Sequence, residues 1–430
     1  VRAKPANGGG GAGPRQRLYA DPKTGRLYVG EADCGDSKAF NQLVEINPET
    51  GQVKLLDLPM ATEDLAIDLN GLFYLRSDIE VARFDPTSWR EIPWDYGEER
   101  ASAGFGCTGG RMCRLLSDLI LPGTGRYGHW HMGGMAVSSR GHLAVTCGNR
   151  TKNEDPRESG ENVHAKDGYK GGGGSKYTPP LYPGRQTGWE THVWDEHGKV
   201  IVQDASPGIA ITDGIGLDRD DNLYLMVSGN RVLDGKPYFL RWGETYVKTK
   251  AGKFKAITAG NGPPVPAADG ALPKRASDMD NTWLEGAEWL YGGVGFNGGA
   301  SGASCICWNA RPALDLYARS FLPEIDHFTV AVLDTGGNLI LRLGKYGNVD
   351  DGKPLVPAGP STGSGQGGPA NPRSIGDDEV ALFHAPYLAT HTDRRLFIAD
   401  IGNARITSVK LGYHAEEKTA LKDVADVDKK

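Results

Sequence analysis

The sequence predicts an all-β protein, a six-bladed β-propeller of four-stranded blades with long loop insertions. Three observations lead to this prediction. The 430-residue chain contains 61 glycines and 26 prolines, which favours short strands joined by turns over long helices. Runs of β-forming residues flank turn sequences along most of the chain. The same order of strands and turns recurs, and four-stranded units that cannot bury both faces alone stack radially into a propeller.

The first two repeat units lie between Arg17 and Ile92. Each has a strand, a turn that contains aspartate, a second strand and then an outer hairpin. The inner strand pairs read RLYADPKTGRLYVG and DLAIDLNGLFYL, and the outer hairpins read LVEINPETGQVKLLDL and VARFDPTSWREI. Recurrence of this order within about 80 residues is an internal repeat.

Three further units have the same pattern. The third unit contains GGMAVSSRGHLAV and THVWDEHGKVIVQDA, the fourth contains GIGLDRDDNLYLMV and YFLRWGETYVKTKAGKFKAI, and the last contains PYLATHTDRRLFIADIGNARITSVKL. The turns between the two inner strands of these five units fall at Asp21, Asp68, Ser138, Asp218 and His391.

One more unit fits between the fourth and the last. We expect it at about residues 288–347, because CICWNARPALD aligns with FIADIGNARITSV through the Asn-Ala-Arg sequences at 309–311 and 403–405. Its outer hairpin is TVAVLDTGGNLILRL, which turns at Asp-Thr-Gly-Gly. This placement gives six blades. Seven blades are the alternative and would require the weakly patterned region 259–326 to be divided.

The segments VAVLDTGGNLILRLGKYGN and LFIADIGNARITSVKL resemble the NHL-repeat propellers, and GMAVSSRGHLAV and GIGLDRDDNLYL are further matches. The resemblance extends from about Arg17 to Leu411 and implies the propeller fold. It does not specify an activity, because such propellers include binding modules, scaffolds and metal-dependent lyases and hydrolases.

Composition divides the chain into a Gly-rich linker or tail (1–14), the propeller (15–415) and a charged C-terminal tail (416–430). Gly- and Pro-rich insertions interrupt the repeats, and long loops on a rigid scaffold often form binding surfaces. They lie at about 98–128, 150–188, 259–287 and 353–379.

The net charge, the apolar runs and the cysteines limit the partners and the compartment that fit this chain. A net charge of -6 removes the electrostatic basis for binding nucleic acid, and no apolar run is long enough to span a membrane. Cys107 and Cys113 can close a small disulfide loop, which favours an extracytoplasmic protein, secreted or periplasmic, whose leader is absent from this chain. Buried free thiols are the alternative.

Candidate site residues follow from the register of the inner strands, whose alternate residues point into the central channel. Counting back from the second strand of each unit places Glu63, Asp213 and either Gln16 or Arg17 at the channel mouth where the inner strands begin. His131 and His384 lie two residues further upstream in their units, on the same side of the strand.

A second resemblance bears on these positions. Peptidyl-hydroxyglycine amidating lyases are similar propellers in which a histidine at this position of three blades binds zinc. Here the matching positions hold Glu63, Gly133, Asp213 and Pro386, so the three-histidine pattern is absent.

A mixed set of candidate ligands remains. His131 and His384 with Glu63 and Asp213 suit zinc, manganese or iron, and the two carboxylates with carbonyls suit calcium. His129 and Met132 raise the possibility of copper, with a loop histidine and packing side chains as the alternative. The sequence therefore allows one divalent metal.

Two functions fit these patterns. The first is a module of a larger protein that binds a protein or carbohydrate-like ligand through loops at the channel mouth, where Gln16, His129 and Trp130 are candidate binding residues. The alternative is a metal-dependent lyase or hydrolase in which Glu63 or Asp213 is a metal ligand or general base.

Two features that could be taken for site residues are interpreted as structural. His327 aligns with an outer strand and is not expected in the channel. The acidic segments 218–222 and 348–352 lack the ligand spacing of calcium loops and are expected to be ordinary turns.

Overall fold

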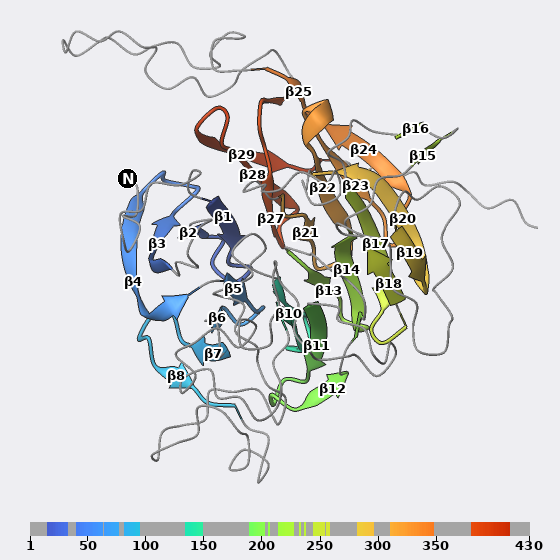
Figure 1. Cartoon of the computed structure of the whole chain (residues 1–430). Helices are drawn as coiled ribbons and strands as arrows, with labels where there is room; N and C mark the ends of the chain where they lie inside the picture. Colours follow the sequence, from blue (N-terminus) through green and yellow to red (C-terminus); the bar gives the residue numbers. More distant parts are fainter. Residues whose placement is uncertain are drawn as a thin grey trace, which may run out of the picture.

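The strands assemble into six antiparallel sheets in a ring, so the protein is a six-bladed β-propeller (Figure 1). The computed structural model describes the chain in the ranges 15–32, 40–62, 64–76, 81–94, 134–148, 189–202, 205–206, 214–227, 232–233, 236–237, 244–253, 255–258, 282–295, 310–347 and 380–412. Within these ranges, no helix has both the length and the apolar composition needed to cross a membrane.

Each blade is a meander that runs outward from the channel. Five blades have four strands, and the sixth has three in the described ranges. From the channel outward, blade 1 contains β1 (Arg15–Ala20), β2 (Leu27–Ala32), β3 (Phe40–Ile46) and β4 (Val53–Thr62), and blade 2 contains β5 (Asp64–Ile67), β6 (Phe73–Arg76), β7 (Val81–Phe84) and β8 (Glu91–Ile92). Blade 3 contains β9 (Met135–Val137), β10 (Leu143–Gly148), β11 (Trp189–Trp194) and β12 (Val200–Val202), and blade 4 contains β13 (Gly216–Leu217), β14 (Asn222–Val227), β17 (Glu244–Lys250) and β20 (Ala287–Val294). Blade 5 contains β21 (Ala313–Leu314), β22 (Ser320–Glu324), β23 (Thr329–Leu333) and β24 (Leu339–Leu343), and blade 6 contains β27 (Tyr387–His391), β28 (Arg395–Asp400) and β29 (Arg405–Lys410).

The described residues also form short strands and a 3₁₀ turn outside the six main sheets. Three two-stranded sheets pair β15 (Val232–Leu233) with β16 (Lys236–Pro237), β18 (Lys255–Thr258) with β19 (Thr282–Glu285), and β25 (Lys345–Tyr346) with β26 (Ala381–Leu382). A single 3₁₀ turn, η1 (Ile325–His327), joins β22 to β23.

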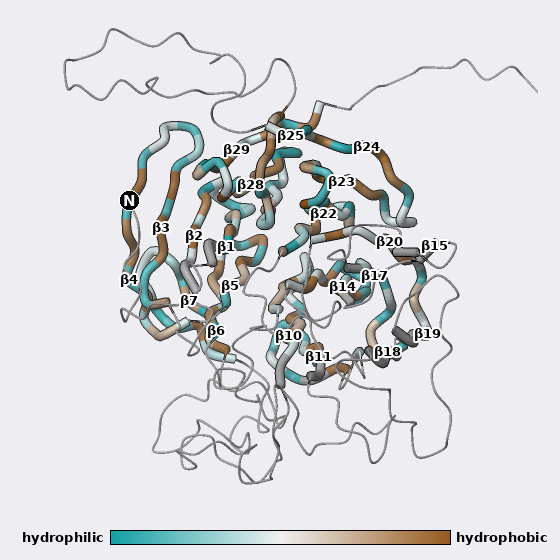
Figure 2. Tube along the Cα trace, turned by 45° about the horizontal axis from the view of Figure 1, so that its top comes forward, coloured by the Kyte–Doolittle hydropathy of each residue, from teal (hydrophilic) through white to brown (hydrophobic). Residues whose placement is uncertain are grey.

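The ring closes because each innermost strand contacts the innermost strand of the next blade, and β27 contacts β1. Blade 6 packs on blade 1 through a buried apolar cluster that contains Leu18, Leu27, Tyr387 and Phe397. Figure 2 shows hydrophobic residues along the strands, as expected for sheets buried between neighbouring blades. Burial of apolar side chains between neighbouring blades is therefore the main contribution to the stability of the ring.

Four of the six turns between the two inner strands share one pattern of hydrogen bonds. At Asp68, Asp218 and Asp315, carboxylate Oδ1 accepts hydrogen bonds from the backbone N–H groups two and four residues later, all at 2.9 Å. Ser138 makes the same pair with its hydroxyl oxygen, at 3.3 and 3.2 Å. A side chain that satisfies its own turn in this way fixes the turn locally, which is why the turns at Asp68, Ser138 and Asp218 could be located from the sequence. The turn at Asp315 was not predicted.

The strand assignment from the sequence is right for blades 1, 2, 3 and 6 and wrong at two places between them. The outer strand of blade 4 is β20, whereas the segment KFKAI forms β18 and pairs with β19 in an added hairpin. Blade 5 begins at Ala313, after Arg311, so the expected start near residue 288 falls in β20 of blade 4. The Asn-Ala-Arg sequences at 309–311 and 403–405 are therefore not equivalent positions.

The two ends of the channel differ in how the chain is connected. We call the end with the six inner turns the turn end. The opposite end, where the inner strands begin, is the loop end. Since strands alternate in direction, the second and fourth strands of a blade also end at the loop end. Residues 95–133, 149–188, 296–309 and 348–379, which follow such strands in the sequence, lie outside the described ranges.

Candidate functional site: two ends of one channel

At the loop end, the carboxylate of Asp64 is the centre of a buried polar cluster. Arg311 donates from Nη1 to Oδ1 at 2.8 Å and from Nη2 to Oδ2 at 3.1 Å. The Tyr19 hydroxyl donates to Oδ1 at 2.9 Å, and Arg17 Nη1 lies 3.5 Å from the same oxygen. The side chains of Arg17 and Asp64 are fully buried. This is a bidentate ion pair reinforced by a second cation and a neutral donor.

The cluster spans the channel. Arg311 precedes β21 of blade 5, and Asp64 begins β5 of blade 2, which is three blades away in the ring of six. Gly214 makes room for the arginine, because a Cβ atom there would lie 2.8 Å from Arg311 Cγ. Burial raises the pKa of the Tyr19 hydroxyl well above its usual value, so the group stays protonated and donates.

Most site residues predicted from the sequence lie outside the described ranges. These are Glu63, Asp213, His129, Trp130 and His131. Gln16 is in β1, paired with Glu31, and its side chain is also outside the description. Within the described ranges, no group of three His, Cys, Asp or Glu side chains is arranged to hold a metal ion.

His384 is the one predicted ligand whose surroundings are described. It follows β26 at the loop end, is half-buried, and its backbone N–H donates to Asp400 Oδ1 at 3.0 Å. Burial lowers the pKa of the imidazole, against a smaller opposing effect of the Asp400 charge. The ring is therefore neutral near pH 7, the form that binds metals or accepts a proton.

Two structural interpretations from the sequence can also be compared. His327 lies in η1, between strands of blade 5, so it is outside the channel as expected but not on an outer strand. The acidic segment at 218–222 is the inner turn of blade 4, where Asp218 bonds its own backbone, and the interpretation as an ordinary turn is confirmed. The segment 348–352 lies outside the described ranges.

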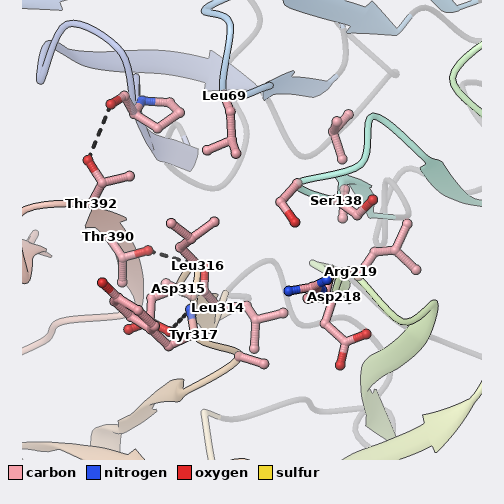
Figure 3. A pocket seen from close by; sticks show the side chains of 18 of the residues that line it. Leu69, Ser138, Asp218, Arg219, Leu314, Asp315, Leu316, Tyr317, Thr390 and Thr392 are labelled. Carbon is pink, nitrogen blue, oxygen red and sulfur yellow. Dashed lines mark hydrogen bonds between the residues drawn. The ribbon is translucent and has the colours of Figure 1, made fainter.

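The turn end contains a cavity of about 680 Å³ that opens among the six inner turns (Figure 3). Both apolar and polar side chains line it. Leu69 and Leu316 are 40% and 44% exposed, and Tyr317 is 59% exposed. Figure 3 shows Ser138 and Arg219 on one side of the space and Thr390, Thr392 and Tyr317 on the other.

Three aspartates at this end, Asp68, Asp218 and Asp315, are structural. Oδ1 of Asp68, Asp218 and Asp315 is bonded to turn amides as described above. Oδ2 of Asp218 also accepts from Asn222 and Tyr224, and Oδ2 of Asp315 accepts from Arg319. These carboxylates are therefore fixed by the turns, and the cavity presents little of their charge to a ligand.

The residue that follows each turn-initiating position forms a ring of six around the cavity. All six line it: Pro22, Leu69, Ser139, Arg219, Leu316 and Thr392. The sequence predicted five of these six turns, at Asp21, Asp68, Ser138, Asp218 and His391, but not the turn at Asp315 or the ring itself. The available signal was leucine directly after the turn aspartate in Asp68-Leu69 and Asp315-Leu316, since leucine is unusual in an exposed turn.

No family model matches the chain, and no curated protein matches it. Among solved structures, the chain is similar to the calcium-binding protein regucalcin of Agrobacterium tumefaciens (12% identity, 92% of this chain, 88% of that chain, TM-score 0.39). It is also similar to XC5397 of Xanthomonas campestris, a gluconolactonase (11%, 91%, 84%, 0.36), and to virginiamycin B lyase of Staphylococcus aureus (10%, 94%, 85%, 0.34).

These likenesses are too distant to bear on the site. The class of the protein rests on its own strand topology, which is that of a six-bladed propeller. The resemblance to NHL-repeat propellers stays a prediction, as does the resemblance to the amidating lyases.

Proposed function

We propose that this propeller is a binding module whose ligand occupies the turn-end cavity. The observation that supports this is the cavity itself. At about 680 Å³ it lies in the range of small-molecule sites, about 300–1,000 Å³, and it combines exposed apolar side chains with a few polar groups. A carbohydrate-like ligand, or a side chain of a protein partner, matches such a lining.

Contacts within the turns fix side chains of this site before a ligand binds. The Tyr317 backbone N–H is bonded to Asp315, and the Arg319 guanidinium lies 5.3 Å from the centre of the Tyr317 ring. The exposed ring therefore has a defined position. Side chains fixed before binding lose little conformational entropy when the ligand arrives, so more of the contact energy becomes affinity.

The proposal can be tested with a neutral aromatic probe, 1-naphthaleneacetamide, followed by its fluorescence. Replacing Leu316 by Asp places a charge on the apolar side of the cavity, and we expect affinity to fall on the order of tenfold. The matched control is Leu339→Asp, in the same blade, because Leu339 is 40% exposed on the outer strand β24 and away from the cavity. Equal affinities of the two variants would show that the cavity is not the site.

A metal-dependent lyase or hydrolase at the loop end is the second candidate. It is favoured by His384, whose lowered pKa keeps the imidazole neutral. His384 with His131, Glu63 and Asp213 would hold the ion, which would polarise a carbonyl or activate water. Arg17 and Arg311 count against it, since two guanidinium groups that pair with Asp64, the residue after Glu63, repel a dication. Elemental analysis of the purified protein decides: less than stoichiometric zinc, calcium or copper would eliminate this candidate.

We also propose an extracytoplasmic location. The support is the pair Cys107 and Cys113, spaced to close a small disulfide loop. Titration of free thiols in denatured protein purified from its native compartment is expected to find this pair oxidised. A full count of six thiols would contradict the proposal.

A further inference from the structure

We infer that the ligand of the turn-end cavity is an organic anion, a ring that bears a carboxylate, and that Arg219 determines this specificity. The inference rests on the proposed function and adds the chemical class of the ligand. It starts from the six positions that follow the turn-initiating residues and surround the cavity. They hold Pro22, Leu69, Ser139, Arg219, Leu316 and Thr392.

Arg219 is the charged member of this ring. Its side chain is 74% exposed. In the described part of the chain its guanidinium has one ion-pair contact, Nε to Oδ1 of the neighbouring Asp220 at 3.9 Å, which is too long for a hydrogen bond. An exposed pair at this distance contributes little, so the donors of the guanidinium are available to a ligand.

The other charged groups of the lining are engaged. Lys248 Nζ lies 2.9 Å from Glu288 Oε2 and donates to the Thr335 carbonyl at 3.3 Å. Asp68, Asp218 and Asp315 are bonded to their own turns. Asp220 is the exception, since its side chain is 73% exposed and its charge opposes an incoming anion.

The backbone under Arg219 is fixed. Asp218 accepts from the amides of Asp220 and Asn222, and the Arg219 carbonyl accepts from Arg140 Nη1 at 3.4 Å. Figure 3 shows Arg219 across the cavity from Tyr317 and Thr392. A ligand that pairs its carboxylate with Arg219 therefore places its ring toward the apolar side, at Leu316 and Tyr317. A planar guanidinium suits a carboxylate because it donates two parallel hydrogen bonds.

The experiment compares two probes of the same shape, 1-naphthaleneacetate and its neutral amide 1-naphthaleneacetamide. We expect the wild-type protein to bind the acetate about fivefold more tightly at low salt, the scale of a partly exposed charge-assisted pair. The preference should shrink as salt is added, because the pair is exposed.

Charge substitutions then give opposite outcomes. Arg219→Gln is expected to abolish the preference for the acetate, and Asp220→Asn is expected to enlarge it. The matched control is Arg90→Gln, an exposed arginine of the β7–β8 turn that does not line the cavity, and it should leave the preference unchanged.

The results separate two kinds of failure. If the two probes bind wild type equally, or if the preference survives Arg219→Gln, this inference is wrong and the proposed function stands. If neither probe binds, or if the amide binds the Leu316→Asp and Leu339→Asp variants equally well, the proposed function fails and the inference fails with it.

Discussion

The two ends of the channel use charged residues in opposite ways. At the loop end, Arg17 and Arg311 are buried and both pair with the buried Asp64, and the pair of Asp64 with Arg311 joins opposite blades of the ring. At the turn end, the aspartates are bonded to their own turns, whereas Arg219 and Asp220 stand exposed at the cavity. The same residue types therefore stabilise the fold at one end and are available to a ligand at the other.

This difference teaches that burial and partners, and not residue type, separate structural from functional positions. Buried charges that satisfy one another are costly to disturb singly, while exposed ones change stability little. If the comparison is right, substitutions at the loop end should change the free energy of unfolding and substitutions at the turn end should change binding.

The largest effect is expected from Asp64→Asn. The substitution keeps the size of the side chain and removes the charge that Arg17 and Arg311 face in a buried site. The free energy of unfolding should fall by about 3–5 kcal/mol. Urea denaturation followed by tryptophan fluorescence measures this. Asp220→Asn at the turn end is the control, and its free energy of unfolding should stay within about 0.5 kcal/mol of wild type. Equal urea denaturation midpoints for the two variants would show that the two ends do not differ in their contribution to stability.

A smaller effect is expected at Gly214. Gly214 and Gly51 both have positive φ, 75° and 72°, so alanine costs about 1 kcal/mol of backbone strain at either position. A Cβ atom at Gly51 meets nothing within 4 Å, whereas one at Gly214 lies 2.8 Å from Arg311 Cγ. Gly214→Ala should therefore destabilise the protein by about 1–2 kcal/mol more than Gly51→Ala. Similar melting temperatures for the two variants would show that Arg311 is loosely held.

The sequence predicted five of the six inner turns and most strands because their causes are local. Each inner turn contains the side chain that bonds its own amides, so Asp68 and Asp218 mark their turns without any tertiary information. The errors in blades 4 and 5 have a different origin. The inserted hairpin β18–β19 separates β17 from its outer partner β20, and only the pairing of distant strands reveals which segment completes the blade.

The site was less accessible from the sequence. The ion pair between Asp64 and Arg311 joins residues 247 positions apart in opposite blades, and no local pattern encodes that contact. Counting along the inner strands did bring the prediction to Glu63, one residue from Asp64, and to the choice between Gln16 and Arg17. Five positions of the turn-end ring could have been found, because each is one residue beyond a turn that the sequence predicted, and only Leu316 follows a turn that was missed.

A pH effect smaller than these is expected at the loop end. Burial lowers the pKa of His384, so the unfolded chain takes up a proton more readily than the folded protein. The sign follows: stability is unaffected by this group above about pH 6.5 and declines as pH falls below that value. His384→Gln should flatten the loss of stability between pH 7 and pH 5. The same replacement at His197, a 57% exposed turn-end histidine, controls for loss of an imidazole. An identical dependence of stability on pH for wild type and His384→Gln would show that His384 does not cause the loss of stability.

The smallest effect on stability is expected at the turn-end ring itself. Leu69 is 40% exposed on the cavity, so Leu69→Ser removes few packing contacts and should change the free energy of unfolding by less than about 0.5 kcal/mol. The same substitution removes apolar surface that the ligand covers, and the affinity for 1-naphthaleneacetamide should fall several-fold. Asp64→Asn, assayed where it is still folded, should show the reverse, with unchanged affinity and reduced stability. If Leu69→Ser instead destabilised the protein and left binding intact, the turn end would be a structural rim and the division of roles between the two ends would be wrong.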